Sequence, residues 1–483
     1  MPGQNRDHAL DHVVVVVFEN RSLDNVLGRL YAPGDGKTFE GVTGKDLTNP
    51  IPEWAEHGAD RKVVPYAVAT DMDSPNPDSG EEYPHTNTQL FNIQNEHNRF
   101  KLGEEITEPY NAPEPGQTPT MDGYVTDYIS CLTAELGRQP ATSSGFAVNS
   151  PVKNFVQKNT AETLFNRLKD HGKTWKVYIA EPMQLSGTGL IHFSRLKDRF
   201  ATHFVPFARF EADAAAGDLP DFSFIEPALG VGHNDYHPAC GRAMGHGIAI
   251  QSIDPPSSIL GGEAFLARLY NAYKAMQSPT GSNVWNTALL IGWDEPGGTY
   301  DHVPPPSVPP PDPSAPVGQD GFTFDRSGYQ VPAIIVSPWV AEGEVLNEEH
   351  RHTSLIATLR EQWGWATRSR HVMLRPGRFP CLHSRYPARP GHGACPRSAA
   401  GAFVHGGCGG PGREPVHAGQ DPGPGDTGVR GAEPCRDRGP AQGPQGRSAP
   451  RAGAACAAEL PGHHLPPAGP GRSGPGHRDL TRM

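Results

Sequence analysis

Residues 13–18 form an unbroken apolar run, five valines followed by a phenylalanine, that ends directly at Glu19 and Asn20. A short β-branched run without alternation of polar and apolar residues is typical of a strand that is buried on both faces. Such a strand needs neighbouring strands beside it and helices above and below it. The run therefore predicts that residues 12–18 lie inside a parallel sheet of an α/β protein.

Similar apolar runs recur along the chain, and helical patterns separate them. This alternation predicts βαβ units and a mostly parallel sheet that is sandwiched by helices. Residues 32–120 read as an irregular excursion, and the proline-rich residues 303–320 as coil or polyproline helix. Further strands are expected at 174–181, 221–227, 286–295 and 331–338, and helices at 161–171, 262–276 and 353–363.

Acidic and amide side chains follow two of these strands. Glu19 and Asn20 follow the first strand, and Asp294 and Glu295 follow the strand at 286–295. Because ligands of open parallel sheets bind beyond the carboxyl ends of the strands, the two pairs are expected to meet at one rim. Hard oxygen ligands suit a divalent cation such as Ca, Mg or Mn, and carboxylates also tolerate Zn. A single pair would more often cap a helix or face water, whereas two pairs favour a metal site.

Three histidines lie in segments rich in Gly, Pro, Asp and Asn, which are EYPHTN for His85, GHNDYHP for His237 and GGTYDHVPPP for His302. These segments read as loops rather than apolar helix faces. Any one of these histidines alone would more often be a solvated loop residue. Together with the carboxylates they indicate a cluster that stabilises an anionic substrate such as a phosphoryl group.

A hydroxyl nucleophile could come from the turn ATSSG at residues 141–145. A hydroxyl at a helix N-terminus beside a metal can lose its proton and attack phosphorus. From spacing alone the same turn also reads as an ordinary loop or helix cap.

The motifs as a set resemble a known family. HVVVVVFENRSLDNVLG is similar to the ENRSFDxxxG opening of the bacterial and plant phosphoesterase family that contains phosphatidylcholine-type phospholipases C and related acid phosphatases. GWDEPGGTYDHVPPP resembles its second signature, usually DEHGGFYDHV. MDGYVTDY, ATSSG, the NDYHP turn, VPAIIVSPWV and RHTSLIATLREQWG occur in the family's order, so the resemblance extends over residues 11–365.

The resemblance implies an alkaline-phosphatase-like α/β fold and hydrolysis of a phosphate ester, by a phospholipase C or an acid phosphatase. It makes Glu19, Asn20, Asp294 and Glu295 metal ligands or their neighbours, for a divalent ion of unassigned identity. The family's nucleophile maps to Thr142, with Ser143 and Ser144 as alternatives, through a phosphothreonine that water later hydrolyses. His85, His237 and His302 match histidines that surround the phosphate.

Charge and composition divide the chain into a domain at 8–368 and a tail at 369–483. The tail has 15 Arg, 7 acidic residues and no Lys, Asn, Ile or Trp, which leaves 27 basic and 46 acidic residues in 1–368. An acidic body argues against nucleic acid as a partner. The tail is expected to be disordered, and its composition suggests a GC-rich gene read out of frame, with a basic, proline-rich interaction tail as the alternative.

Two features leave the activity open. Only residues 129–140 join MDGYVTDY to ATSSG, where the family pattern has a longer segment with a strand. Either a segment is missing between 129 and 141, or the turn is reached another way. A catalytically inactive remnant that binds metal or phosphate is therefore the alternative function, and a sulfatase or phosphoglycerate-mutase relative is weaker. No signal peptide or transmembrane run is apparent, which predicts a cytoplasmic chain without stable membrane insertion, although family members are often exported and the start could be truncated.

Overall fold

The computed structural model describes residues 6–365, all within the first of two compact units, which ends at His405. Within this span the described residues omit 57, 59, 70–71, 73–78, 102–104, 138–158, 182–185, 230–231 and 239–256. The predictions for the tail at 369–483 and for the junction between 129 and 141 thus fall wholly or partly outside the described residues.

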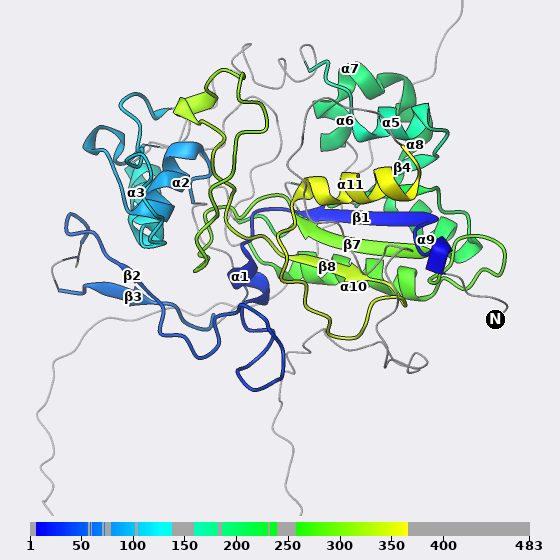
Figure 1. Cartoon of the computed structure of the whole chain (residues 1–483), viewed down its shortest axis with the longest axis horizontal. Helices are drawn as coiled ribbons and strands as arrows, with labels where there is room; N and C mark the ends of the chain where they lie inside the picture. Colours follow the sequence, from blue (N-terminus) through cyan, green and yellow to red (C-terminus); the bar gives the residue numbers. More distant parts are fainter. Residues whose placement is uncertain are drawn as a thin grey trace, which may run out of the picture. The chain divides into compact units, whose positions relative to one another are not determined.

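A sheet of six strands forms the centre of this unit, in the order β5-β4-β6-β1-β7-β8 (Figure 1). All neighbours run parallel except β7 and β8, which pair antiparallel. The mostly parallel α/β fold is therefore confirmed. The strands are β1 (His12–Phe18), β4 (Trp175–Ile179), β5 (Phe204–Pro206), β6 (Phe222–Glu226), β7 (Thr287–Trp293) and β8 (Ala333–Val336).

Helices pack on both faces of the sheet, and the alternation of side chains along β1 shows why the valine run is needed. Val14, Val16 and Phe18 join a core with α9 (Phe207–Ala216) and α10 (Leu260–Lys274). Val13 and Val15 point to the opposite face and join a core with α5 (Leu164–Asp170) and α11 (His352–Gln362). Since successive strand residues face opposite sides, only a continuous apolar run can fill both cores. In Figure 1, α11 and α10 are seen on either side of the sheet.

The predicted helices at 161–171, 262–276 and 353–363 correspond to α5, α10 and α11, with ends that differ by a few residues. The remaining helices of the described residues are α1 (Leu23–Leu27), α2 (Tyr83–Phe91), α3 (Tyr124–Gly137), α6 (Gly187–Ile191), α7 (Phe193–Leu196), α8 (Phe200–His203) and the 3₁₀ turns η1 (Arg6–His8), η2 (Glu96–Asn98), η4 (Lys197–Arg199) and η6 (Gln319–Gly321).

The segment 32–120 is more ordered than the sequence suggests. It contains a small hairpin, β2 (Thr48–Pro50) with β3 (Val63–Pro65), as well as α2. Helix α2 packs against α3 around a third apolar core that includes Leu90, Phe91 and Tyr124. Among the described residues, no helix has both the length and the apolar character to cross a membrane.

Candidate metal and phosphate site

The two polar pairs predicted from the sequence meet at the carboxyl ends of β1 and β7. The two strands pair in register up to their last residues, so the residues after them leave the sheet at the same level. The amide of Asp294 donates to the carbonyl of Phe18 at 2.9 Å, and the amide of Asn20 donates to Asp294 Oδ1 at 3.1 Å. The amide of Arg21 donates to the carbonyl of Glu295 at 3.1 Å. The prediction that these pairs share one rim is therefore confirmed.

A turn of two glycines after Glu295 allows this close approach. Asn20 has a left-handed backbone with φ of +61°, and Gly297, with φ of +58°, lies directly against it. A Cβ atom at Gly297 would be 2.4 Å from the Cβ of Asn20, which no side chain could tolerate. Gly298 is as constrained, since its Cβ would be 2.4 Å from that of Ser79. These glycines bring the strand ends and the loop before α2 together.

Two further carboxylates join the pairs, and neither was predicted from the sequence. Asn20 Nδ2 donates a hydrogen bond to Oε1 of Glu81, in the loop that precedes α2. The amide of Glu19 donates to the carbonyl of Asp235 at 2.8 Å, and Asp235 is fully buried. Both stand beside histidines that the sequence singles out, Glu81 in EEYPH and Asp235 in NDYHP, and this proximity was the available signal.

Three carboxylates of this cluster, Glu19, Asp294 and Glu295, have a raised pKa, and burial is the largest cause for each. Burial raises the pKa of Glu19 well above its usual value, and the charges of Asp235, Asp294, Glu81 and Glu295 add to the effect. Burial, together with Glu81, raises the pKa of Glu295 to about 9. The site still opens to solvent, because 29% of the Glu19 side chain is exposed. Clustered carboxylates beside an amide oxygen suit a hard divalent cation, whose charge would relieve this repulsion.

His237 is the predicted histidine that lies against this cluster. Its Nε2 is 4.0 Å from Glu19 Oε2 and 4.0 Å from Glu81 Oε1. Its Nδ1 is 2.8 Å from the carbonyl oxygen of Pro238, an atom that can only accept, so Nδ1 carries the proton. Nε2 is therefore the ring atom able to exchange a proton at the cluster.

The prediction that His85 lies in a loop is wrong, because it lies in the first turn of α2 and is 3% exposed. Its Nδ1 is 2.6 Å from Oδ1 of Asp127 on α3, whose Oδ2 accepts from Gln89 Nε2 at 2.8 Å. Burial lowers the pKa of His85, but Asp127 and Cys131 outweigh burial, so the pKa lies well above its usual value. The buried Nε2 has no hydrogen-bond partner among the described residues. His85 nevertheless lies next to the cluster, because its ring packs against the backbone of Gly80, the residue before Glu81. A Cβ atom on Gly80 would lie 2.0 Å from Cγ of His85.

His302 is engaged elsewhere, next to α1. Its Nδ1 is 2.7 Å from Oδ2 of Asp24, and its Nε2 is 3.1 Å from Oε1 of Glu40. Asp24 and Asp301 are both buried, and burial followed by the charge of Asp24 raises the pKa of Asp301 to about 7. The three histidines thus lie in three different environments. Only His237 lies beside a residue predicted as a metal ligand, Glu19.

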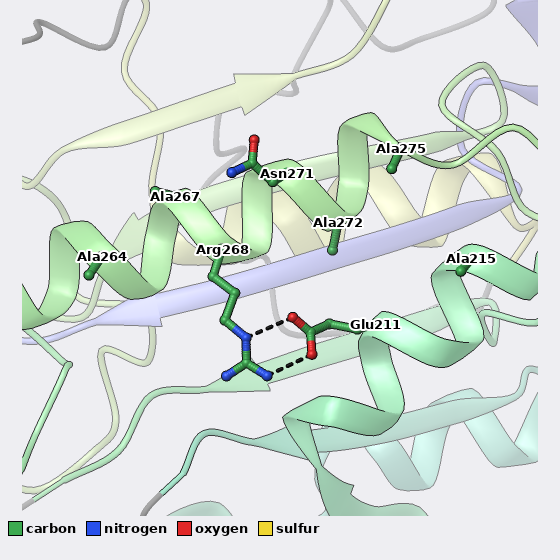
Figure 2. A pocket seen from close by; sticks show the side chains of 8 residues that line it. All are labelled: Glu211, Ala215, Ala264, Ala267, Arg268, Asn271, Ala272 and Ala275. Atoms are coloured by element: carbon green, nitrogen blue, oxygen red, sulfur yellow. Dashed lines mark hydrogen bonds and ion pairs between the residues drawn. The ribbon is translucent and has the colours of Figure 1, made fainter.

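The proposed nucleophile Thr142, with its alternatives Ser143 and Ser144, lies outside the described residues. A shallow groove lies apart from the strand ends, between α9 and α10 (Figure 2). Alanines line it, together with Arg268, whose guanidinium forms a two-point ion pair with Glu211 at 2.7 and 2.6 Å. The groove has no set of carboxylates and histidines comparable to the one at the carboxyl ends of β1 and β7.

Known proteins resemble the chain over most of its length. It is 28% identical to non-specific phospholipase C6 of Arabidopsis thaliana over 406 residues, which cover 72% of this chain and 67% of that protein. It is 29% identical to non-specific phospholipase C1 of the same plant, over 72% of this chain and 66% of that protein. A non-hemolytic phospholipase C of Pseudomonas aeruginosa is 24% identical, over 74% of this chain and 54% of that protein.

A family model, described as the phosphoesterase family, matches residues 115–366, which is just over half of the chain. The match includes Asp294 and Glu295 but begins after Glu19 and Asn20. These two residues are connected to the matched region by the pairing of β1 with β7 and by the bond from the Asn20 amide to Asp294. With the model match, the relatives and the parallel α/β fold in agreement, this chain belongs to the phosphoesterase family.

Proposed function

We propose that this chain hydrolyses phosphate esters with a divalent cation bound at the carboxyl ends of β1 and β7. The observation that carries the proposal is the convergence of Glu19, Asn20, Asp294 and Glu295 from strands that lie more than 250 residues apart in sequence. Burial and then neighbouring negative charges raise the pKa of Glu19 and Glu295, and a divalent cation would supply the compensating charge. Membership of the phosphoesterase family supports the same reaction class.

The chain's own groups have separate roles in this reaction. Glu19, Asn20, Asp294 and Glu295 would hold the cation, which would polarise a phosphoryl oxygen and favour the ionised form of a nearby hydroxyl. The hydroxyl of Thr142 attacks phosphorus, and the bond from phosphorus to the leaving alcohol oxygen breaks. His237 Nε2 takes up the proton that the hydroxyl loses and passes it to that oxygen, because Nδ1 keeps its own proton in the bond to a carbonyl oxygen. Water then breaks the bond between Thr142 and phosphorus. It releases the phosphorylated head group from a phosphodiester, or phosphate from a phosphomonoester, and restores the threonine hydroxyl.

The substrate is of the phospholipase C type under this proposal. The three relatives compared with the chain are phospholipases C, and they support a phosphodiester with an alcohol head group over a phosphomonoester. The chain spans about two thirds of the length of the plant relatives. The head group that it accepts is therefore taken from the substrate test below and not from those relatives.

The test measures hydrolysis of p-nitrophenylphosphorylcholine and p-nitrophenyl phosphate by the full chain after chelation and after return of Ca, Mg, Mn or Zn. We expect metal-restored cleavage, faster with the phosphorylcholine ester. Asp294→Asn, which keeps shape but removes a ligand charge, should abolish it. Asp198→Asn, at an exposed acid on η4, is the matched control and should keep full activity.

Absence of turnover with every metal, in a folded sample, would refute the proposal. Turnover that survives both chelation and Asp294→Asn would refute the role of the cation. Preference for p-nitrophenyl phosphate would overturn the phospholipase assignment and leave a phosphatase.

A further inference from the structure

Asn20 can serve a cation only through its side-chain carbonyl oxygen, because its amide nitrogen is a donor of two hydrogens. Its main chain is already fixed, by the bond from its amide to Asp294 Oδ1 at 3.1 Å and by the close approach of Gly297. These contacts do not fix the rotation of the terminal amide about χ2, for which two orientations half a turn apart have similar energy. A group that fixes this rotation would decide whether Asn20 presents its oxygen or its nitrogen.

Glu81 has the chemistry to make that choice. Its Oε1 accepts the hydrogen bond from Asn20 Nδ2. A carboxylate has no hydrogen to donate, so turning the amide by half a turn would bring the oxygen of Asn20 against that of Glu81. The observed orientation directs the amide nitrogen to Glu81 and leaves the oxygen of Asn20 for another partner.

The backbone beside Glu81 is held firmly enough for this task. The carbonyl of Gly80 accepts from Gln89 Nε2 at 2.7 Å, and a Cβ on Gly298 would lie 3.1 Å from that same carbonyl oxygen. The ring of His85 lies against Gly80 on another side. The turn after Glu295 and the buried face of α2 thus clamp the residue before Glu81.

We propose that Glu81 is a positioning residue of the metal site, which acts through Asn20 by holding the amide with its oxygen available to the cation. The inference rests on the proposed metal site and adds a residue that lies outside the family motifs found in this sequence. Removal of a residue that hydrogen-bonds to a metal ligand typically changes metal affinity by about 10–100-fold.

The test is a double-mutant cycle on the affinity of the full chain for Mn²⁺, measured by titration calorimetry after chelation. Glu81→Ala should weaken Mn²⁺ binding by roughly 10–100-fold. Asn20→Gly removes the ligand and still accepts the left-handed backbone. In the Asn20→Gly background, Glu81→Ala should have little further effect, because the amide that it positions is gone.

Glu81→Gln is the conservative variant. Its side-chain oxygen can still accept from Asn20 Nδ2, but its amide nitrogen can also donate to the oxygen of Asn20, so it should recover only part of the affinity that Glu81→Ala loses. Glu96→Ala removes an acid whose side chain is 88% exposed, and it should leave Mn²⁺ binding unchanged. Circular dichroism of the metal-free variants confirms that each is folded.

Additive effects of Glu81→Ala and Asn20→Gly would overturn the inference and make Glu81 an independent ligand. Loss in Glu81→Gln as large as in Glu81→Ala would do the same. If the wild-type chain binds no Mn²⁺, Ca²⁺, Mg²⁺ or Zn²⁺, the proposed metal site itself fails, and this inference fails with it.

Discussion

Removal of the Asp127 carboxylate should destabilise the fold far more than removal of an exposed acid. Asp127 is 1% exposed, and its two oxygens accept from His85 Nδ1 at 2.6 Å and from Gln89 Nε2 at 2.8 Å. Asp127→Ala would leave both nitrogens buried without this acceptor. Gln89 is further held by Tyr329, whose hydroxyl donates to Gln89 Oε1 at 2.9 Å, so the amide cannot turn away without breaking another bond.

Breaking one partner of a buried ion pair costs about 3–5 kcal/mol, because the remaining charge stays buried and uncompensated. At about 2 °C per kcal/mol for a domain of this size, the Tm should fall by roughly 5–10 °C. Asp11 provides a matched control, since its Oδ2 is 2.9 Å from Nδ1 of His8 and both side chains are exposed. Asp11→Ala breaks the same kind of pair at the surface and should cost at most about 1 kcal/mol.

The effect of Asp127→Ala should also depend on pH. The folded-state pKa of His85 is raised above its usual value of 6.5, so the folded state binds a proton more tightly than the unfolded state. The stability that the pair supplies is therefore fully present below pH 6.5 and is lost as pH rises through the raised value. The penalty of Asp127→Ala should be largest in mildly acidic buffer and shrink in alkaline buffer.

Urea unfolding of the full chain at several pH values measures this penalty for both variants. Equal destabilisation by Asp127→Ala and Asp11→Ala would refute the assignment of a buried pair. A penalty that grows towards alkaline pH would show that His85 is neutral in the folded protein, contrary to the raised pKa.

Three further outcomes are expected. Mn²⁺ at 100 times its Kd should stabilise the chelated full chain by about 2.7 kcal/mol, seen as a higher Tm that Asp294→Asn removes; an unchanged Tm would contradict binding to the folded state. Asp301→Asn should become more stable relative to the wild type as pH rises from 4 to 7. The folded pKa of Asp301, about 7, exceeds the usual 3.8, so the wild type loses up to roughly 4 kcal/mol of stability over that range. Parallel pH profiles of stability for the two proteins would refute the buried pair of Asp24 and Asp301. Gly297→Ala should weaken Mn²⁺ binding by tenfold or more, as outer-shell changes do, while Gly116→Ala, at a similar backbone angle but in open space, should leave binding unchanged in calorimetry.

The central sheet and the polar side chains at its carboxyl rim could be predicted because each depends on residues that are neighbours in sequence. An apolar run of valines is best satisfied as a doubly buried strand, and the residues directly after a parallel strand must lie at its carboxyl end. The pairing of Glu19 and Asn20 with Asp294 and Glu295 came from that rule alone.

The surroundings of the histidines could not be predicted, because they depend on distant contacts. Helix α2 buries the polar residues Asn87, Thr88 and Gln89. Asn87 and Gln89 hydrogen-bond to partners far along the chain, and Thr88 to the helix backbone at Pro84. From sequence alone, a polar segment with a proline near its start reads as a loop. The position of Glu81 close to His85 in EEYPH makes it a candidate, but its contact with Asn20, 61 residues away, could not be read from that pattern.

The position of β1 in the sheet has a consequence for how the protein is made. This strand is synthesised first, yet its partners are β6 and β7, more than 200 residues later. At about 5–20 residues per second, the valine run waits many seconds on the ribosome before either neighbour exists. During that time an apolar, β-prone segment is without its own partners, which invites chaperone binding or aggregation. Fragments that end before Trp293 should therefore be insoluble, and slow translation over the first 290 residues should lower the yield of folded protein.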